Sequence, residues 1–481
     1  MNVLVLNPPS KYAKNVVRDL IYGCWCKGKR IGGTKAPPLN LLYVATVLKE
    51  NGHNVKLLDA LAEQKDLTAV RKLAKKADVL IISTSNMSFN EDMEVLTELK
   101  KENQKLFTIS FGSHVTFMPD SILNTKALDV GVMYEAEFVI RDIVNAINEG
   151  KSWKEVKGMC YKEGEKVIVN EQYPFIQDLD ELPIPDRSFL PKKIDYFNPI
   201  VKKVPYTTAM TSRGCPSLCT FCNVPTFYGS KIRARSAENV IKEIEQIISL
   251  GYKEIWFRDE LFTVYKKRNE EICNYIIENK LKISWIANGK TNMITKEQMA
   301  LMKKAGCHMI KFGVESGVQK VLNEVKKGTT VENHRKVFKW SQEVGIDTHA
   351  HMMLGMPGDT KETVEETIRF VKEIAPTTVT FGICTPYAGT PLFNHVKEVF
   401  PEIADGSCID LKTLHTDARY NQYYTQLDSE ELNKYVRKAY RSFYFRPSYL
   451  FKWLTRIRSM DELRRVILAG TQVFSFSVGK E

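Results

Sequence analysis

The chain has 481 residues, 43% of them hydrophobic, which is enough for two or three domains with buried cores. Its 69 basic residues exceed its 57 acidic residues, and the net charge of +12 favours an anionic partner (a phosphate, a nucleic acid or a membrane surface) without choosing among them. No run of about 18 apolar residues is present and no signal peptide is recognisable, so we expect no transmembrane helix. Ten cysteines without regular pairing indicate a reducing, cytoplasmic location.

The first 150 residues alternate between short apolar runs and helical patterns. The apolar runs lie at residues 3–6, 55–58, 79–82, 107–111 and 130–133, and the helical patterns at 39–50, 67–76, 91–103 and 137–148. This alternation predicts a parallel sheet with helices on both faces, a doubly wound, Rossmann-like domain. Ligands of such sheets bind at the carboxyl ends of the strands. The small or polar residues expected there include Asn7, Ser83, Ser85, Gly112, His114 and Glu135.

Residues 151–200 have a different pattern. Two strand-like runs, 159–161 and 166–169, flank Glu163-Gly164 and predict a hairpin. An acidic, proline-bearing segment follows at residues 174–193. We therefore expect this region to be a hairpin and linker between two domains.

Strands and helices alternate again from residue 201 to residue 400. The strand-like runs are 206–211, 254–257, 283–287, 309–314, 347–354 and 378–383, and the helical stretches between them include 237–250, 267–279, 296–305 and 361–374. Six units are too few for an eightfold barrel and fit a partial (β/α)6 barrel. The sequence thus predicts an α/β protein that ends in a helical segment at residues 401–481.

Three cysteines follow the first strand of this barrel, where the chemistry of such barrels lies. Cys215, Cys219 and Cys222 have the spacing C-x3-C-x2-C. Three thiolates this close can hold three corners of a [4Fe–4S] cluster and leave the fourth iron open to another ligand. A zinc site would need a second short Cys/His cluster. The other seven cysteines make no second C-x2-C; they are Cys24, Cys26, Cys160, Cys273, Cys307, Cys384 and Cys408.

Further candidates lie at the ends of later strands. Arg258 and Asp259 follow the second strand, Glu315 and Ser316 the fourth, and Gly355 and Gly358 the fifth. A carboxylate such as that of Glu315 can accept both hydroxyls of a ribose. The alternatives are a solvated turn at residues 258–260 and a helix cap at Asp359 or Thr360. Cys384 is interpreted as a buried small hydrophobic residue.

These motifs together resemble the cobalamin-binding radical S-adenosylmethionine (SAM) family, often called class B. The resemblance lies in C-x3-C-x2-C, Glu315-Ser-Gly and Gly355-Met-Pro-Gly-Asp-Thr, with Pro37-Pro-Leu and Gly112-Ser-His in the N-terminal region. It implies a [4Fe–4S] cluster whose open iron is chelated by SAM, from which a 5′-deoxyadenosyl radical is made. It also implies SAM contacts from Arg258 and Asp259 and from the two later segments, Glu315-Ser316 and Gly355–Gly358. Cobalamin is implied at the strand ends of residues 1–150.

Two departures from that family pattern matter. The Asp-x-His-x-x-Gly motif that supplies a histidine to cobalt is absent, so we expect cobalamin without a histidine ligand; His53 and His114 lack that setting. The Gly-Glu-Gly-Glu of the last N-terminal strand is replaced by Tyr134-Glu135-Ala136-Glu137, which keeps both carboxylates and neither glycine.

The C-terminal segment combines apolar and aromatic residues at helical spacing with basic residues between them. The basic residues are Lys434, Arg437, Lys438, Arg441, Lys452, Arg456 and Arg458. These helices either cap the barrel or rest on an anionic membrane as peripheral elements.

The function implied by the resemblance is methylation of an unactivated carbon in an apolar or lipid-derived substrate. The first alternative is formation of a ring or another carbon–carbon bond with the same cofactors. An RNA-modifying enzyme is the second alternative, but it requires a second cluster and an RNA-binding motif, and neither is recognisable. We expect a reductant such as a ferredoxin or flavodoxin as partner, a small-molecule or lipid substrate, and no nucleic acid.

Overall fold

The computed structural model describes the chain except residues 12, 15–27, 30–34, 87, 193, 195, 197, 400, 402–420, 455–456, 458–459 and 479–481. Five residues considered above therefore lie outside the described part, namely Cys24, Cys26, Cys408, Arg456 and Arg458, as does the side chain of Lys452.

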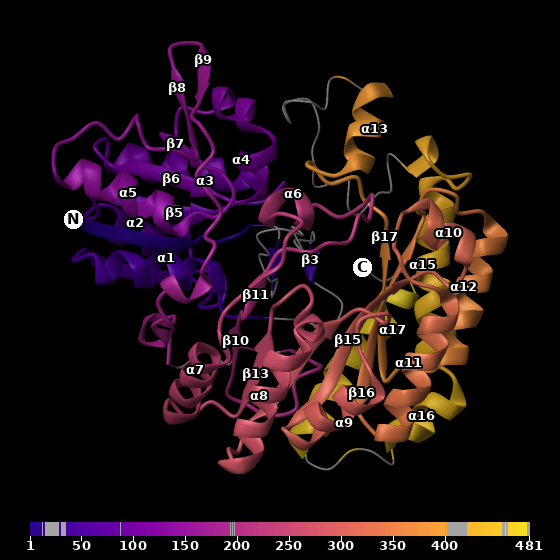
Figure 1. Ribbon diagram of the computed structural model, residues 1–481. Coiled ribbons are helices and arrows are strands. Elements are labelled where there is room, and N and C mark those ends of the chain that lie inside the picture. Colours follow the sequence, from indigo (N-terminus) through magenta and orange to yellow (C-terminus); the bar gives the residue numbers. More distant parts are fainter. Residues whose placement is uncertain are drawn as a thin grey trace.

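A seven-stranded sheet organises the N-terminal domain (Figure 1). Its strands are β1 (Asn2–Asn7), β4 (Asn54–Asp59), β5 (Val79–Ser83), β6 (Phe107–Phe111), β7 (Val130–Val132), β8 (Met159–Glu163) and β9 (Lys166–Val169). The order is β4-β1-β5-β6-β7-β8-β9, and the first five strands are parallel. All five strands predicted in the first 150 residues are confirmed. The strand order reverses beside β1, the point at which such sheets bind ligands.

Helices cover both faces of this sheet, which confirms the doubly wound domain. Helices α1 (Leu39–Glu50) and α5 (Glu137–Asn148) pack on one face in a core shared with β1, β6 and β7. Helices α2 (Leu67–Ala74) and α3 (Phe89–Glu102) pack on the other. A short helix, α4 (Ser113–Phe117), follows β6. Apolar side chains alternate between the two faces along each strand, so both faces must be covered.

The hairpin belongs to the N-terminal sheet, although we expected it within the linker. Strands β8 and β9 are antiparallel, and β8 pairs with β7 so that Gly131 lies opposite Cys160. The sheet therefore extends past residue 150 to Val169. The hairpin pattern was visible in the sequence, but its pairing to a strand 30 residues away is a long-range contact that local patterns do not reveal.

The six predicted strands form the second domain's sheet, in sequence order and all parallel, which confirms the partial barrel. They are β10 (Tyr206–Ala209), β13 (Glu254–Phe257), β14 (Ser284–Gly289), β15 (Cys307–Glu315), β16 (Asp347–Leu354) and β17 (Thr378–Ile383). Two further pairs are short: β11 (Ser212–Arg213) with β12 (Arg233–Ala234), and β2 (Ala13–Lys14) with β3 (Gly28–Lys29).

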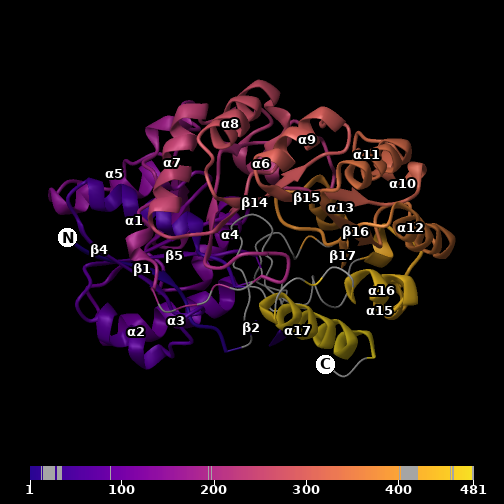
Figure 2. The same ribbon diagram turned by 90° about the horizontal axis from the view of Figure 1, so that it is seen from below.

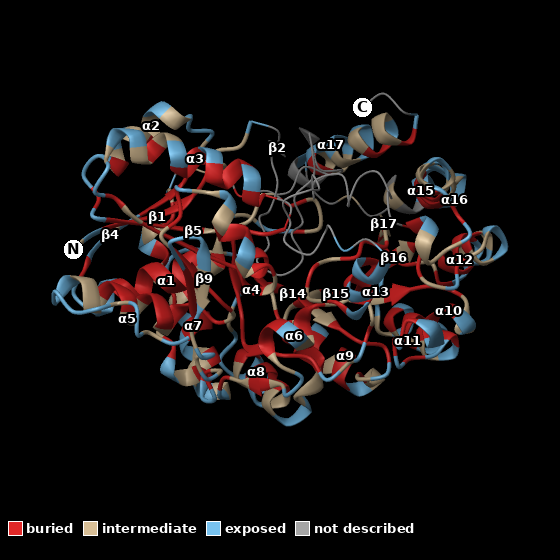
Figure 3. Cartoon of the chain, turned by 90° about the horizontal axis from the view of Figure 1, so that it is seen from above, coloured by how far each residue is buried: buried red, intermediate tan, exposed pale blue. Residues whose placement is uncertain are grey.

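Helices line the outer side of the barrel strands (Figure 2). They are α7 (Ala237–Ser249), α8 (Lys266–Glu278), α9 (Lys296–Lys304), α10 (Gln319–Glu324), α11 (Val331–Val344) and α12 (Lys361–Ile374). Two more helices, α6 (Val224–Tyr228) and α13 (Pro391–Val399), lie beyond the carboxyl ends of the strands and pack against the N-terminal domain. Side-chain oxygens of Ser236, Thr295, Thr330 and Thr360 cap four of the outer helices. The predicted cap before residue 361 is thus confirmed at Thr360. Exposed residues lie on the outward sides of the helices, while the central strands of both sheets are mostly buried (Figure 3).

Three helices end the chain: α15 (Ser429–Tyr444), α16 (Pro447–Leu454) and α17 (Met460–Ser477). The apolar face of α15 packs into the barrel core through Leu432, Val436 and Phe443. The hydroxyls of Tyr440 and Tyr444 accept hydrogen bonds from backbone N–H groups of the edge strand β17. The capping interpretation is therefore confirmed for α15. In the described part of the chain, no helix is long and apolar enough to span a membrane.

Candidate active site

The three motif cysteines lie on one loop between β11 and α6. Cys215 and Cys219 are buried and Cys222 is half-buried. The loop is held by backbone bonds from Cys215 to Gly229 (3.2 Å) and from Thr220 to Val325 (3.1 Å). Gly214 before it has φ +94°, and a side chain there would overlap the carbonyl of Lys231. The loop is thus fixed at the carboxyl end of the first barrel strand, as expected.

Two buried arginines join this loop to the N-terminal domain. Arg213, two residues before Cys215, forms ion pairs with Glu137 and, at 3.2 Å, with Glu135. Arg233, on the paired strand β12, contacts the other oxygen of Glu135 at 2.9 Å. All four side chains are at most 6% exposed. The cysteine loop is therefore locked to the end of β7.

Glu135 was predicted to contact a cofactor, but its oxygens already accept several hydrogen bonds. Besides the two arginines, the backbone N–H of Ile176 donates to it at 2.8 Å. Burial disfavours its charged form, yet the arginines outweigh burial and lower the pKa of Glu135. The carboxylates of Tyr134-Glu135-Ala136-Glu137 thus serve as a bridge between domains, and the cofactor contact of Glu135 stays a prediction.

Glu315 stands at the end of β15 in an unusual backbone conformation. Its φ is +64°, a value that non-glycine residues seldom adopt and that occurs at functional sites. The buried ammonium of Lys327 donates to Glu315 Oε1 at 2.7 Å. Burial alone would lower the pKa of Lys327, but the Glu315 carboxylate raises it. A Cβ at Gly313 would overlap Glu315 Oε1, so glycine there makes room for the pair.

The neighbouring candidates shape the turns around that pair. The hydroxyl of Ser316 lies 3.1 Å from that of Thr367 and ties the turn to α12. Gly355 and Gly358 have φ values of +73° and +83°. Asp359 follows Gly358 and precedes α12. Its carboxylate accepts a hydrogen bond from the backbone N–H of Met356 at 3.0 Å, and burial raises the pKa of Asp359 to about 6. These residues build the rim of the barrel, and their SAM contacts stay predictions.

Asp259 and Arg258 point in different directions. Asp259 is fully buried and accepts bonds from Thr211 and from the Ser212 hydroxyl (2.6 Å), just before the cysteine loop. Its position makes it a brace for that loop. The Arg258 guanidinium lies 4.4 Å from the ring centre of Trp256, on the inner side of the barrel. Cys384 is fully buried among apolar side chains, in agreement with its interpretation as a small hydrophobic residue.

Lys290 and Lys327 were missed by the sequence reasoning. Lys290 donates to Ser217, inside the cysteine loop, at 2.8 Å. Both lysines are over 90% buried. A cluster held by three thiolates is negatively charged, and two nearby ammonium groups offset that charge. Lys290 directly follows β14, a strand-end position that could have marked it as a candidate.

The carboxyl edge of the N-terminal sheet holds several buried polar atoms without hydrogen-bond partners in the described structure. They are Asn7 Oδ1, Asn86 Oδ1, Ser113 Oγ and His114 Nδ1. Such atoms are costly unless a ligand or water satisfies them. Ser83, Ser85 and Gly112 lie at the same strand ends, and Gly112 has φ +128°. The donors and acceptors needed by a large polar cofactor are thus present at this edge.

Neither of the histidines in this domain is placed as a free metal ligand. His114 is stacked on Phe89 with ring centres 3.9 Å apart, and its Nε2 lies 2.9 Å from Ser121 Oγ. Burial lowers the pKa of His114 to about 3, so its ring is neutral. His53 Nε2 lies 2.8 Å from Asn145 Oδ1. Both rings are used in packing and hydrogen bonds within the domain.

Among the described residues, no three Cys, His, Asp or Glu side chains are arranged to hold a single metal ion. A [4Fe–4S] cluster differs because each cysteine binds a separate iron. The donor set on the loop, three thiols and no histidine, fits such a cluster.

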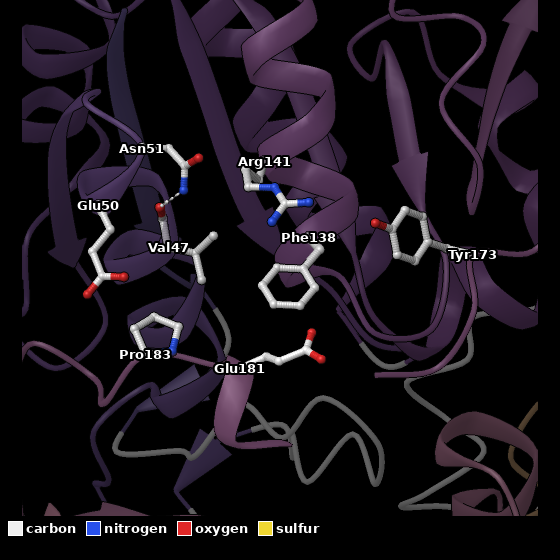
Figure 4. A pocket seen from close by; sticks show the side chains of 8 residues that line it. All are labelled: Val47, Glu50, Asn51, Phe138, Arg141, Tyr173, Glu181 and Pro183. Carbon is white, nitrogen blue, oxygen red and sulfur yellow. Dashed lines mark hydrogen bonds between the residues drawn. The ribbon is translucent and has the colours of Figure 1, made fainter. Parts of the chain in front are cut away.

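A separate pocket of about 380 Å³ lies on the outside of the N-terminal domain (Figure 4). Side chains of α1, α5 and residues 173–183 line it, and no predicted site residue is among them.

Comparison with known proteins supports the same cofactors. Residues 210–371 match the radical SAM superfamily, and residues 32–144 match the B12 binding domain. The chain is 33% identical over 465 residues to an uncharacterized methyltransferase of Pyrococcus horikoshii, covering 94% of each chain. It is 27% identical to the anaerobic magnesium-protoporphyrin IX monomethyl ester cyclase of Rubrivivax gelatinosus, covering 90% of this chain and 78% of the cyclase.

The fold is similar to that of OxsB, a cobalamin-dependent SAM radical enzyme solved with aqua-cobalamin and SAM bound. The TM-score is 0.71 with 17% identity, over 99% of this chain and 72% of OxsB. The protein is an enzyme whose cofactors are a [4Fe–4S] cluster, SAM and cobalamin. With its two matched domains and its close relative, the chain belongs to the cobalamin-binding radical SAM family of methyltransferases and cyclases.

Proposed function

We propose that this enzyme methylates an unactivated carbon of an apolar or lipid-derived substrate. The proposal rests on one observation: the cysteine loop and the N-terminal domain share a core. Cys215, Val224 and Phe227 pack in the same cluster as residues of α1, α5 and β7. The ring of Phe227 lies 6.1 Å from that of Phe117 and 6.2 Å from that of Tyr134. The cluster motif is therefore joined to the domain that binds B12.

When bound, the cluster and SAM supply a 5′-deoxyadenosyl radical and cobalamin supplies a transferable methyl group. The residues of the chain position these groups and exclude water. Cys215, Cys219 and Cys222 would hold the cluster, and Glu315, oriented by Lys327, would accept the ribose hydroxyls of SAM. The unpaired atoms of Asn7, Ser113 and His114 would bond cobalamin. A ferredoxin or flavodoxin is proposed to deliver the electron.

Ring formation is the main alternative, since a cyclase is among the relatives and would use the same cofactors. No described feature favours RNA modification. Cys24 and Cys26 are too few to hold the second cluster that such an enzyme needs, and they lie outside the described residues.

The two leading reactions are separated by product mass. The reconstituted enzyme is incubated anaerobically with reductant, with methylcobalamin and SAM that both carry a deuterated methyl group, and with a total lipid extract. Methylation gives a product heavier by one deuterated methyl group, whereas oxidative ring formation gives a product lighter by two hydrogens. Formation of 5′-deoxyadenosine with neither product in any lipid fraction would contradict the lipid substrate.

We also propose that α16 and α17 rest on a membrane surface near that substrate. Phe451 is 70% exposed, Ile467 56% and Phe474 53%. Since the apolar face of α15 is covered by the barrel, these later helices supply the apolar contact. Co-sedimentation with anionic vesicles should fall in a Phe451→Ser and Ile467→Ser double variant and stay unchanged in the control Val399→Ser, whose side chain is also exposed. Equal sedimentation of wild type, the double variant and the control would contradict the proposed membrane contact.

A further inference from the structure

Two of the unpaired buried atoms at the carboxyl edge of the N-terminal sheet are hydrogen-bond acceptors whose orientation the chain fixes. They are Asn7 Oδ1 and His114 Nδ1, and neither has a hydrogen-bond partner in the described structure. Asn7 ends β1 and His114 follows β6, and β5 lies between these two strands in the sheet. Neighbouring strands are about 4.8 Å apart, so the ends of β1 and β6 lie about 10 Å from each other. One large ligand can therefore reach both atoms.

The side-chain amide of Asn7 is oriented by Asp59. Asn7 Nδ2 donates to Asp59 Oδ1 at 2.7 Å, and the backbone N–H of Ala62 donates to the same oxygen at 3.1 Å. The hydroxyl of Tyr196 lies 3.0 Å from Asp59 Oδ2. Burial raises the pKa of Asp59, but Oδ1 stays an acceptor even when a proton is on Oδ2. Turning the amide over would put two acceptors together, so the oxygen of Asn7 is held away from Asp59 and toward the edge.

The lone pair of His114 is placed in a similar way by Ser121. His114 Nε2 lies 2.9 Å from Ser121 Oγ, and that hydroxyl donates its proton to the carbonyl of Met118 at 2.7 Å. Ser121 can therefore only accept from the ring, so the hydrogen of the neutral ring is on Nε2 and Nδ1 is an acceptor. Burial, which lowers the pKa of His114 to about 3, keeps the ring neutral. Stacking on Phe89 fixes the plane of the ring.

Two further unpaired atoms at this edge add to its acceptor character. Asn86 Oδ1, in the turn after β5, is an acceptor, and the hydroxyl of Ser113 can accept or donate. Both residues are buried. A buried acceptor that finds no donor is costly, so a ligand that fits this edge brings N–H or O–H groups and not further lone pairs.

We propose that this edge selects a corrinoid whose peripheral side chains are amides, and that Asn7 Oδ1 and His114 Nδ1 accept hydrogen bonds from the amide N–H groups. A primary amide carries two N–H donors, whereas an ionised carboxylate in its place is an acceptor only. Opposite Asn7 or His114, a carboxylate would set lone pairs against lone pairs and would be buried without a donor. Asp59 and Ser121 are positioning residues, since each orients one of the two acceptors. The inference rests on the proposed function, because it names the form of the cobalamin that the same enzyme uses.

Equilibrium dialysis of the full chain against three corrinoids tests this. Cobalamin and cobinamide carry amides at the rim of the corrin, and cobyrinic acid carries carboxylates in their place. We expect wild type to bind cobinamide roughly tenfold more tightly than cobyrinic acid, or better, since one hydrogen bond is worth about a factor of ten. Asn7→Ala and His114→Gln should each weaken cobalamin and cobinamide binding about tenfold and cobyrinic acid binding much less. Glutamine at position 114 keeps a nitrogen that can reach Ser121 and removes the Nδ1 acceptor.

Asn2→Ala is the matched control, because Asn2 lies exposed at the amino end of the same strand as Asn7. Its side-chain oxygen accepts from Asn54 at 2.8 Å, and its loss should leave all three affinities unchanged. Asp59→Asn and Ser121→Ala should narrow the difference in affinity between cobinamide and cobyrinic acid, because each change lets an acceptor turn. A merely structural role of Asp59 or Ser121 would weaken the binding of both corrinoids alike.

Equal affinities of wild type for cobinamide and cobyrinic acid would overturn the proposal. Losses in Asn7→Ala and His114→Gln that are the same for both corrinoids would also overturn it. Nitrogen superhyperfine splitting of bound cob(II)alamin that disappears in His114→Gln would assign Nδ1 to cobalt and contradict its role as an acceptor for an amide. The dialysis needs neither cluster nor turnover, so failure to transfer a methyl group would count against the proposed function alone.

Discussion

The ion-pair bridge between the cysteine loop and the N-terminal domain predicts a measurable coupling between stability and iron retention. In Glu137→Gln the shape of the side chain is kept and one buried charge is removed. Arg213 then retains only Glu135, which it shares with Arg233. Removing one partner of a buried ion pair typically costs about 3–5 kcal/mol. Because Glu135 still offsets part of the charge of Arg213, we expect the free energy of unfolding to fall by about 3 kcal/mol. This corresponds to a fall in Tm of about 6–12 °C for the N-terminal domain.

The matched control is Glu149→Gln, the same substitution at the end of α5. Its pair with Lys151 is exposed, with side-chain exposures of 51% and 72%, and no measurable shift is expected. Thermal unfolding and iron content after desalting are measured on both variants. Since Arg213 lies two residues before Cys215, Glu137→Gln should also release iron faster.

A double variant separates this coupling from general damage. Arg213→Met combined with Glu137→Gln should destabilise by less than the sum of the two single changes, since the second change removes a charge already left unpaired. A Tm for Glu137→Gln equal to that of Glu149→Gln, or strictly additive single changes, would refute the bridge.

Three further outcomes follow from the site. Gly313→Ala should displace the ion pair of Glu315 and Lys327 and weaken SAM binding about tenfold, with iron retained. Gly382→Ala is the control and should change neither SAM affinity nor iron content, because an added methyl group there meets no described atom within 4 Å. Equal SAM affinities of the two variants, measured by equilibrium dialysis, would contradict this prediction. Burial lowers the pKa of His114, and of the buried His334 in α11, to about 3 from the ordinary 6.5. The unfolded state therefore binds more protons, and stability is lost as pH falls below about 6.5. At pH 5 each of these two histidines should lower the free energy of unfolding by about 2 kcal/mol. In urea unfolding, the variant His114→Gln, His334→Gln should therefore lose less stability between pH 7 and pH 5 than wild type does. An equal loss in both proteins would exclude the two rings as its source. The electron paramagnetic resonance spectrum of bound cob(II)alamin should lack nitrogen superhyperfine splitting, and seeing that splitting would show a nitrogen ligand on cobalt.

The sequence predicted the elements of the fold well because each depends on local signals. The apolar runs of both domains became strands, and Thr360 capped its helix as the pattern indicated. The placement of the hairpin was missed because its partner strand is set by tertiary packing. The membrane interpretation of α15 also fails for a tertiary reason, since β17 and the barrel core cover its apolar face.

The candidate site was predictable only in part. Cysteine spacing identified the loop. The roles of Asp259 and Glu135 were not predictable, because their hydrogen-bond partners lie up to 98 residues away in sequence. A carboxylate at a strand end looks the same in sequence whether it binds a ligand or braces a loop.

Anaerobic reconstitution of the purified chain, followed by quantification of iron, sulfide and corrinoid, tests the central claim most directly. The account predicts about four iron atoms, about four sulfides and about one corrinoid per wild-type chain. In the Cys215→Ala, Cys219→Ala, Cys222→Ala triple variant, iron and sulfide should be lost while the corrinoid is retained, because the two cofactors are held by different domains. Full iron in the triple variant, or no corrinoid on the wild-type chain, would contradict the assignment of this protein as a cobalamin-dependent radical SAM enzyme.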